Sequence, residues 1–246
     1  MRISKLLVSA AVLVATLGAA SAADLPARTT KAPVLVAPYD WSGFYIGANA
    51  GYASSRFNWF FTDDPTAPGP AANEGAHSAT GAVAGGQIGY NWQMSSWVFG
   101  VEAQGDWANL SGQSGSQFFA GFINRSRVDA LGFFTGKVGY AWNNTLLYVK
   151  GGAAVSRNTY DYFGTAPGTA SPENRWGGVV GIGLDYGFAP NWSLGIAYDH
   201  AFFGTRHIPF VQTGPFGLPS DDISQNLDMV TMRINYRFGG PIVARY

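Results

Sequence analysis

From Trp41 onward, apolar and polar residues alternate at every second position. Between Trp97 and Trp107 the odd positions are aromatic, aliphatic or glycine, whereas the even positions include Glu102, Gln104 and Asp106. A β-strand places successive side chains on opposite faces, and a helix would mix the two sets. The same alternation recurs along the chain and predicts eight strands, at residues 44–52, 80–92, 97–107, 127–142, 146–155, 175–188, 192–202 and 227–238.

The connections between these segments alternate strictly between long and short. The short ones are 93–96, 142–145 and 188–192, and the long ones are about 54–79, 108–126, 156–174 and 203–226. Outer-membrane barrels combine an even number of antiparallel strands with short periplasmic turns and longer outer loops. We therefore predict an all-β fold, an eight-stranded antiparallel transmembrane β-barrel over residues 41–246. The alternative is a soluble eight-stranded barrel of the lipocalin type, whose apolar face would point inward.

The composition supports a surface that faces something other than water. Hydrophobic residues make up 47% of the chain and aromatic ones 15%, but charged residues only 12%, about half the share of an ordinary soluble domain. The formal net charge is zero, which excludes a basic nucleic-acid binder. Cysteine is absent, so disulfides, thiolate metal sites and a lipid-modified cysteine are excluded.

The first 40 residues follow a different pattern. Two cations precede a largely apolar run from Leu6 to Leu17, and Ala20-Ser21-Ala22 provides a small-residue cleavage site. This order predicts a cleaved signal peptide at residues 1–22, because the run is shorter than the roughly 20 apolar residues that span a bilayer. Residues 23–40 contain three prolines and no periodic pattern, which predicts an extended periplasmic linker.

Aromatic residues gather at the strand ends next to the short connections. In membrane barrels such residues form a girdle at the level of the lipid headgroups. The predicted girdle consists of Phe44, Trp92, Trp97, Tyr140, Trp142, Phe188, Trp192, Tyr236 and Phe238.

If the apolar face meets lipid, the charged face points into the lumen. Five acidic and five basic residues lie on that face, and such a balanced set can neutralise itself, whereas a lone buried charge is very costly. The predicted lumen network consists of Glu102, Asp106, Asp129, Lys137, Lys150, Arg175, Asp185, Asp199, Arg233 and Arg237. The interior of an eight-stranded barrel is just wide enough for side chains to fill, so we expect a plugged or very narrow bore.

Catalytic and cofactor motifs are missing from the sequence. There is no phosphate-binding loop, no GxSxG and no HExxH, and the three histidines are too scattered for a metal site. We therefore expect no enzyme activity, no cofactor and no metal. A lipid-modifying enzyme stays open as a third hypothesis, and it would need a hydroxyl or carboxylate beside His200 on the outer wall. Asp199 does not supply it, because neighbours on a strand face opposite sides.

Several stretches resemble one known family. They are WSGFYIG (41–47), GGQIGYNWQ (85–93), WVFGVEAQGDW (97–107), GKVGYAW (136–142) and the late INYRFGG. Together they resemble the small outer-membrane barrels of alpha-proteobacteria, described as porin-family or OmpA-like β-barrel proteins. The resemblance implies an eight-stranded barrel in the outer membrane that contributes to envelope integrity and exposes its loops at the cell surface. It brings no catalytic residues with it.

The expected function is structural, with a narrow porin-like channel for small solutes as the alternative. The expected partners are outer-membrane lipids, lipopolysaccharide and the barrel-insertion machinery, with no nucleic acid, and the barrel is expected to be a monomer. Tyr236 and Phe238, or else the last residue Tyr246, would provide the aromatic insertion signal.

Overall fold

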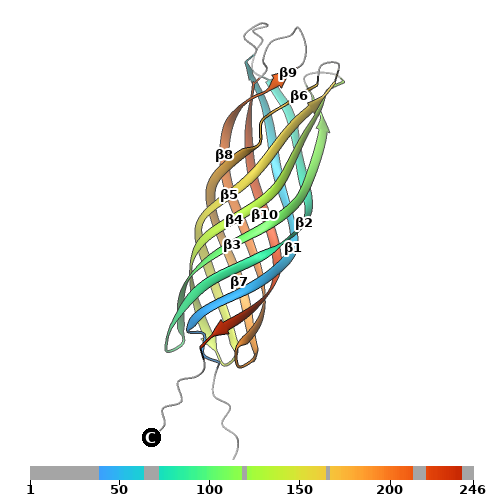
Figure 1. The fold of residues 1–246 in the computed structure, drawn as a ribbon. Helices are drawn as coiled ribbons and strands as arrows, with labels where there is room; N and C mark the ends of the chain where they lie inside the picture. The colour runs from blue at the N-terminus through green and yellow to red at the C-terminus, as the bar shows by residue number, and fades with distance from the viewer. Residues whose placement is uncertain (1–38, 64–71, 118–120, 165–166, 213–219, 240–246) are drawn as a thin grey trace, which may run out of the picture. The chain divides into compact units, whose positions relative to one another are not determined.

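Eight long antiparallel strands form a closed barrel (Figure 1). The computed structural model describes residues 39–63, 72–117, 121–164, 167–212 and 220–239. The predicted signal peptide, residues 23–38 of the predicted linker, and Tyr246 lie outside the described residues. The strands are β1 (Gly43–Asp63), β2 (Ala72–Met94), β3 (Trp97–Gly115), β4 (Ile123–Trp142), β5 (Thr145–Phe163), β6 (Gly168–Thr169), β7 (Glu173–Ala189), β8 (Trp192–Pro209), β9 (Val211–Gln212) and β10 (Ser220–Phe238).

Each long strand pairs with its neighbour in the chain, and β1 closes the barrel against β10. The short β6 and β9 pair with each other and extend β5 at the end of the barrel away from the short turns (Figure 1). The predicted eight-stranded antiparallel barrel and its three short connections, at 95–96, 143–144 and 190–191, are therefore confirmed. The described part of the chain contains no helix long and apolar enough to cross a bilayer.

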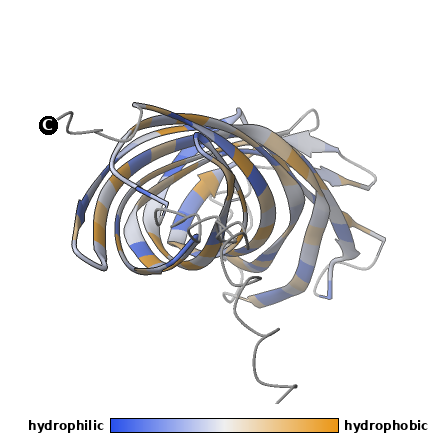
Figure 2. Ribbon diagram, turned by 90° about the horizontal axis from the view of Figure 1, so that it is seen from below, coloured by the Kyte–Doolittle hydropathy of each residue, from blue (hydrophilic) through white to orange (hydrophobic). Residues whose placement is uncertain are grey.

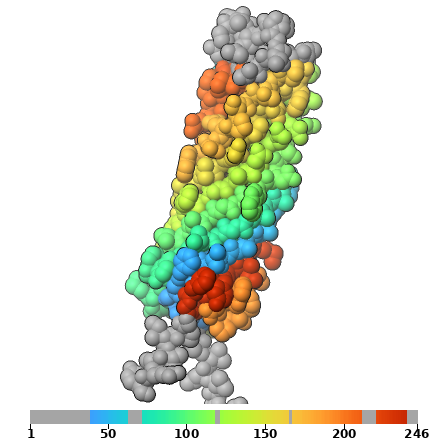
Figure 3. All heavy atoms as spheres, viewed as in Figure 1, coloured from blue at the N-terminus to red at the C-terminus, as the bar shows by residue number. Residues whose placement is uncertain are grey.

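The half of the barrel next to the short turns follows the expected pattern of faces. Along β3, Phe99 and Val101 are exposed on the outer wall while Glu102 and Gln104 are buried inside. Seen along the bore, hydrophilic and hydrophobic bands alternate on the ribbons (Figure 2). From the side, the outward side chains of neighbouring strands cover the wall in oblique stripes (Figure 3). The stretch Trp97–Trp107, whose outward residues are apolar or glycine, has the length of about 9–11 residues that a tilted membrane strand needs.

We call the half next to the short turns, with its apolar outer surface, the belt. Beyond the belt the strands continue, but the apolar side chains now lie on the inner face and the polar side chains on the outer face. On β1, Tyr52 is exposed on the belt, but Phe57 and Trp59 are fully buried inside while Arg56 and Asn58 face outward. Phe57 and Trp59 belong to an apolar cluster that fills this half of the barrel together with residues such as Leu110, Tyr160 and Phe210. We call this half the collar.

The collar corrects the prediction of four long loops. Most residues of the predicted stretches 54–79, 108–126, 156–174 and 203–226 lie in the extended ends of the eight strands. The apolar positions of the collar keep a period of two, but they point inward because the wall there faces water instead of lipid.

A β-bulge corrects one predicted lumen residue. On β4 the register shifts between Val128 and Ala130, so that Val128 is buried inside the barrel and Asp129 is exposed on the outer wall. Thr159 donates a hydrogen bond of 3.3 Å to the carboxylate of Asp129. The extra residue of a bulge exchanges the two faces of the strand beyond it, and the alternation in the sequence alone does not show this exchange.

Candidate functional site

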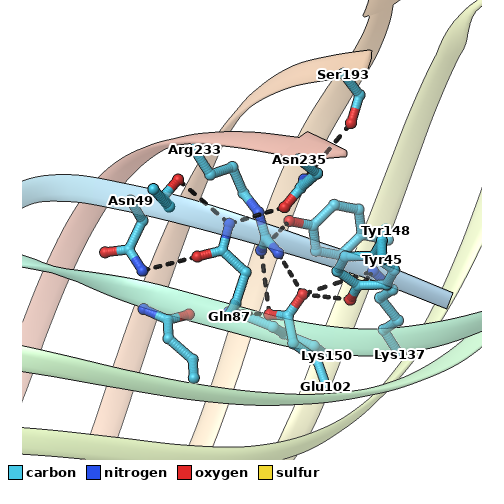
Figure 4. Close-up of polar contacts among 12 residues, drawn as sticks. Tyr45, Asn49, Gln87, Glu102, Lys137, Tyr148, Lys150, Ser193, Arg233 and Asn235 are labelled. Carbon is cyan, nitrogen blue, oxygen red and sulfur yellow. Dashed lines mark hydrogen bonds and ion pairs between the residues drawn. The ribbon is translucent and has the colours of Figure 1, made fainter. Parts of the chain in front are cut away.

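Four charged side chains meet inside the barrel, in the half next to the short turns (Figure 4). Glu102 of β3 receives two hydrogen bonds from the guanidinium of Arg233 on β10, one of them at 3.2 Å. The Nζ atoms of Lys137 on β4 and Lys150 on β5 each lie 3.7 Å from a carboxylate oxygen of Glu102. All four residues are at most 5% exposed, so one buried carboxylate contacts cations from three other strands inside the barrel.

Two tyrosines and an aspartate complete this cluster. Tyr45 donates a hydrogen bond of 2.5 Å to Glu102 and accepts one of 2.9 Å from Lys137. The hydroxyl of Tyr148 accepts a hydrogen bond of 3.0 Å from Arg233. Asp199 lies 3.0 Å from Lys150 and adds a second negative charge. We call Glu102, Arg233, Lys137, Lys150, Asp199, Tyr45 and Tyr148 the lumen cluster.

A layer of uncharged polar side chains lies beside the lumen cluster (Figure 4). Asn49 donates to Gln87 at 2.9 Å, Gln87 donates to Asn235 at 2.8 Å, and Asn235 donates to Ser193 at 3.5 Å. These residues come from the adjacent strands β2, β1, β10 and β8, so the layer connects four neighbouring strands on the inner wall.

Asp106, Asp185 and Arg175 also lie inside the barrel, but among the described residues they form no hydrogen bond or ion pair with the Glu102 carboxylate. Asp106 accepts a hydrogen bond of 2.8 Å from Gln104. Asp185 is 2% exposed, and its Oδ1 atom has no hydrogen-bond partner among the described residues. Arg175 lies in the collar, where it donates to the Tyr160 hydroxyl at 3.1 Å and to two backbone carbonyls at 2.9 Å.

The end of the barrel next to the short turns is closed by residues just before β1. Tyr39 and Trp41 are buried, and their rings lie 4.5 Å apart. Arg237 of β10 stacks on Tyr39 at 5.4 Å and donates a hydrogen bond of 3.1 Å to the backbone carbonyl of Ser42. Its guanidinium also lies 3.7 Å from Asp40. The segment Tyr39–Ser42, which we call the mouth segment, therefore fills the bore. A pocket above it has room for about one water molecule.

Sequence reasoning missed the inward tyrosines and the mouth segment. The residues next to Tyr45 and Tyr148 face outward, so the alternation places both tyrosines inside the barrel. An aromatic side chain does not by itself indicate a hydrogen bond with a buried charge, so the alternation does not predict their contacts with Glu102, Lys137 or Arg233. The mouth segment lies within or next to the predicted linker, and the sequence carries no signal that it folds into the bore.

The residues of the predicted girdle line the outer wall near the short turns. Each is exposed except Tyr236, which is half-buried. Tyr236 packs between two of the others, with ring centroids 5.1 Å from Trp192 and 5.0 Å from Phe238.

A second polar group lies on the outer wall, at the boundary between belt and collar. His200 of β8 and Asp228 of β10 face each other across the strands, with 2.7 Å between Nδ1 and Oδ1. Tyr198 donates a hydrogen bond of 2.6 Å to the same carboxylate oxygen. The carboxylate that the lipid-modifying hypothesis requires beside His200 is therefore present, and it comes from β10, not from Asp199. No three histidines or carboxylates form a metal-binding group within the described ranges.

The buried ionisable side chains of the collar include Glu74, His77 and Asp221. Glu74 accepts a hydrogen bond of 2.6 Å from Asn124, and burial raises the pKa of its carboxyl group. His77 shares hydrogen bonds with Ser126 at 3.0 Å and Ser114 at 3.2 Å, and burial lowers the pKa of its imidazole. Burial, the nearby charge of Glu74 and that of Asp222 raise the pKa of Asp221 to about 8.

Comparison with known proteins places the chain among outer-membrane proteins. Residues 9–239 match the family described as outer membrane protein beta-barrel domain. The 31 kDa outer-membrane immunogenic protein of Brucella melitensis is 29% identical over 249 residues, which cover 96% of this chain and 99% of the relative. The 22 kDa outer membrane protein of Rhizobium leguminosarum bv. viciae is 27% identical over 80% of each chain. The crystal structure of OprG from Pseudomonas aeruginosa shares the fold, with a TM-score of 0.50 and 11% identity over 80% of this chain and 97% of OprG.

Proposed function

Because the chain belongs to the outer membrane protein beta-barrel domain family and is located in the outer membrane, we propose that it is a closed, structural barrel of the envelope. The observation that carries this proposal is the lumen cluster, in which Glu102 joins Arg233, Lys137 and Lys150 across the bore. A solute moving through the barrel would have to separate these buried partners, which is costly in a low-dielectric interior.

The closed backbone ladder and the mouth segment support the same role. A closed barrel pairs its backbone groups between neighbouring strands, which is a condition for a stable structure in lipid. The mouth segment occupies the turn-side end of the bore, where Arg237 binds it through Ser42 and Asp40. We propose that the protein acts as a monomer, that outer-membrane lipids surround its belt, and that the insertion machinery recognises β10 with its aromatic residues Tyr236 and Phe238.

Single-channel recording tests the closed barrel against the narrow porin-like channel. We expect the refolded wild-type barrel to give no conductance steps in a planar bilayer. The double variant Glu102→Gln/Lys137→Met is the matched control, because it removes one charge of each sign from the lumen cluster. Cooperative folding of both proteins has to be verified first. Reproducible wild-type openings whose ion selectivity changes in the double variant would make solute transport the function.

The pair of His200 and Asp228 favours a second candidate, a lipid-modifying enzyme. A carboxylate on Nδ1 orients an imidazole so that Nε2 can act as a base. However, the strands place Asp228 between His200 and Ser54, whereas in a catalytic relay the base lies between acid and nucleophile. The hydroxyl of Tyr198 donates a hydrogen bond to the same carboxylate of Asp228 and does not contact His200 as a nucleophile would. We therefore propose that this group has no catalytic role.

Mass spectrometry of lipid products tests the second candidate. We expect the wild-type barrel, in vesicles of phospholipid and lipid A, to release no more fatty acid than the His200→Ala variant. His200 lies on the outer wall, so this variant should leave the barrel interior unchanged. Fatty-acid release by the wild type that is lost in His200→Ala, and reduced in Asp228→Asn, would establish an enzyme.

A further inference from the structure

Three arginines share the outer wall of β4 and β5 just above the apolar belt. Arg157 of β5 is opposite Ala130 of β4, and Arg127 is opposite Thr159. Arg125 is one outward position further along β4. We call these three residues the β4–β5 arginine patch.

The bulge at Asp129 creates this patch. Below the bulge the odd-numbered side chains of β4, such as Lys137 and Leu131, point into the barrel. Above it the odd-numbered side chains point outward, and Asn124, Ser126 and Val128 are buried instead. Without the extra residue, Arg125 and Arg127 would face the apolar interior of the collar. The bulge therefore turns two arginines toward the membrane boundary, on the same face as Arg157.

The patch keeps unpaired positive charge. Two acidic side chains lie beside the three arginines: Asp161, opposite Arg125 and 3.1 Å from Arg127, and the exposed Asp129 at the bulge. The arginines outnumber them, and in the part of the chain that the structure describes neither Arg125 nor Arg157 has an ion pair within 4.0 Å or a side-chain hydrogen bond. Two other exposed cations of the collar do have acidic partners: Arg206 lies 3.6 Å from Glu173, and His207 lies 3.0 Å from Asp222. Arg56 has no acidic partner among the described residues, but it stands alone on β1.

Two exposed tryptophans on the neighbouring strands β3 and β7 flank the patch. Trp107 of β3 is opposite Ala130, the residue paired with Arg157, and its side chain is 79% exposed. On the other side, Trp176 of β7 is opposite Val155, two residues before Arg157 on β5. Tryptophan favours the boundary between hydrocarbon and headgroups. The arginines therefore lie where the phosphates of outer-leaflet lipids lie.

We propose that the β4–β5 arginine patch binds the phosphate of lipid A, the phosphorylated glycolipid of the outer leaflet. The planar guanidinium of arginine donates two parallel hydrogen bonds to a phosphate, and the interface strengthens this interaction because its dielectric constant is below that of bulk water. The acyl chains of the bound lipid lie along the belt between Trp107 and Trp176. The inference rests on the outer-membrane location and is independent of whether the lumen conducts.

Native mass spectrometry of the full barrel with added lipids tests the proposal. We expect bisphosphorylated lipid A to bind more tightly than its dephosphorylated form and than phosphatidylglycerol. Arg125→Gln/Arg157→Gln should weaken the binding of bisphosphorylated lipid A about tenfold, since it removes two cations with no internal partner. The control Arg206→Gln removes a collar arginine that lies outside the patch and already has an acidic partner. Its affinity should stay within about twofold of the wild type.

Three results would overturn the proposal. They are an unchanged affinity in Arg125→Gln/Arg157→Gln, an equal loss in Arg206→Gln, and equal or tighter binding of dephosphorylated lipid A or phosphatidylglycerol. Both substituted side chains lie on the outer wall, and retention of the heat-modifiable electrophoretic mobility of the folded barrel verifies that each variant has folded.

Discussion

The Glu102→Gln variant is expected to lose about 3–5 kcal/mol of unfolding free energy, because it leaves three buried cations without their shared carboxylate. Arg233, Lys137 and Lys150 all contact Glu102, and none is more than 5% exposed. Glutamine has nearly the same shape as glutamate, so the loss reports the charge and not a cavity. Urea unfolding in lipid vesicles, followed by tryptophan fluorescence, measures the change.

Glu173→Gln is the matched control for this prediction. Glu173 lies 3.6 Å from Arg206 in the collar, and the side chains of Arg206 and Glu173 are 52% and 24% exposed. An exposed ion pair contributes at most about 1 kcal/mol, so this variant should unfold almost like the wild type. In Glu102→Gln/Lys137→Met one unpaired cation is removed as well, so the double variant should lose less than the sum of its two single changes. Equal losses for Glu102→Gln and Glu173→Gln would contradict the proposed importance of the lumen cluster.

The membrane half of the fold could be predicted from the sequence because lipid outside and polar groups inside impose one consistent alternation. The stretch Trp97–Trp107 illustrates this, since its odd residues line the outer wall and Glu102 points into the lumen. The partners of Glu102 could not be predicted. They come from β4, β5 and β10, and which residues meet across the bore depends on the register and tilt of the strands.

The sequence pattern predicts loops where the collar lies, because the polarity of the collar is the reverse of that in the belt. Arg56 faces outward and Phe57 inward, which is the arrangement of the soluble barrel considered as the alternative for the whole chain. Each half of the barrel therefore obeys the rule for its own solvent, with apolar residues toward lipid in the belt and away from water in the collar. Where a strand passes from lipid to water, its apolar residues move from the outer face to the inner face. Apolar and polar residues still alternate at every second position.

The alternation of apolar and polar residues in the sequence also does not predict β-bulges or contacts between aromatic side chains. The regular alternation further along β4 predicts Asp129 in the lumen, but one extra residue at the bulge exchanges the faces. Trp59 packs against Tyr160 and Phe210 in the collar, with ring centroids 5.9 and 5.7 Å apart. These three residues are distant in sequence, so their packing follows from the closed barrel.

The collar also makes stability depend on pH through Asp221. This residue lies outside the membrane belt, is 5% exposed, and its Oδ1 atom has no hydrogen-bond partner among the described residues. Burial raises the pKa of its carboxyl group from 3.8 to about 8. Between pH 4 and 8 the folded collar therefore retains a proton that the unfolded chain releases. The sign follows directly: this stabilising contribution is complete below pH 4 and is lost as the pH rises toward 8.

We therefore expect the free energy of opening the collar to fall with rising pH between about 4 and 8, by at most about 1.4 kcal/mol per pH unit. Hydrogen exchange of the backbone amides of Asp221–Ile223, corrected for the intrinsic pH dependence of exchange, measures this slope. Asp221→Asn keeps the shape of a neutral carboxyl group and should abolish the slope, so that the collar of the variant is more stable than the wild type at pH 8. Asp129→Asn, an exposed carboxylate on the outer wall, should leave the slope in place. A wild-type slope that Asp221→Asn does not change would show that another group, such as Glu74, binds the proton.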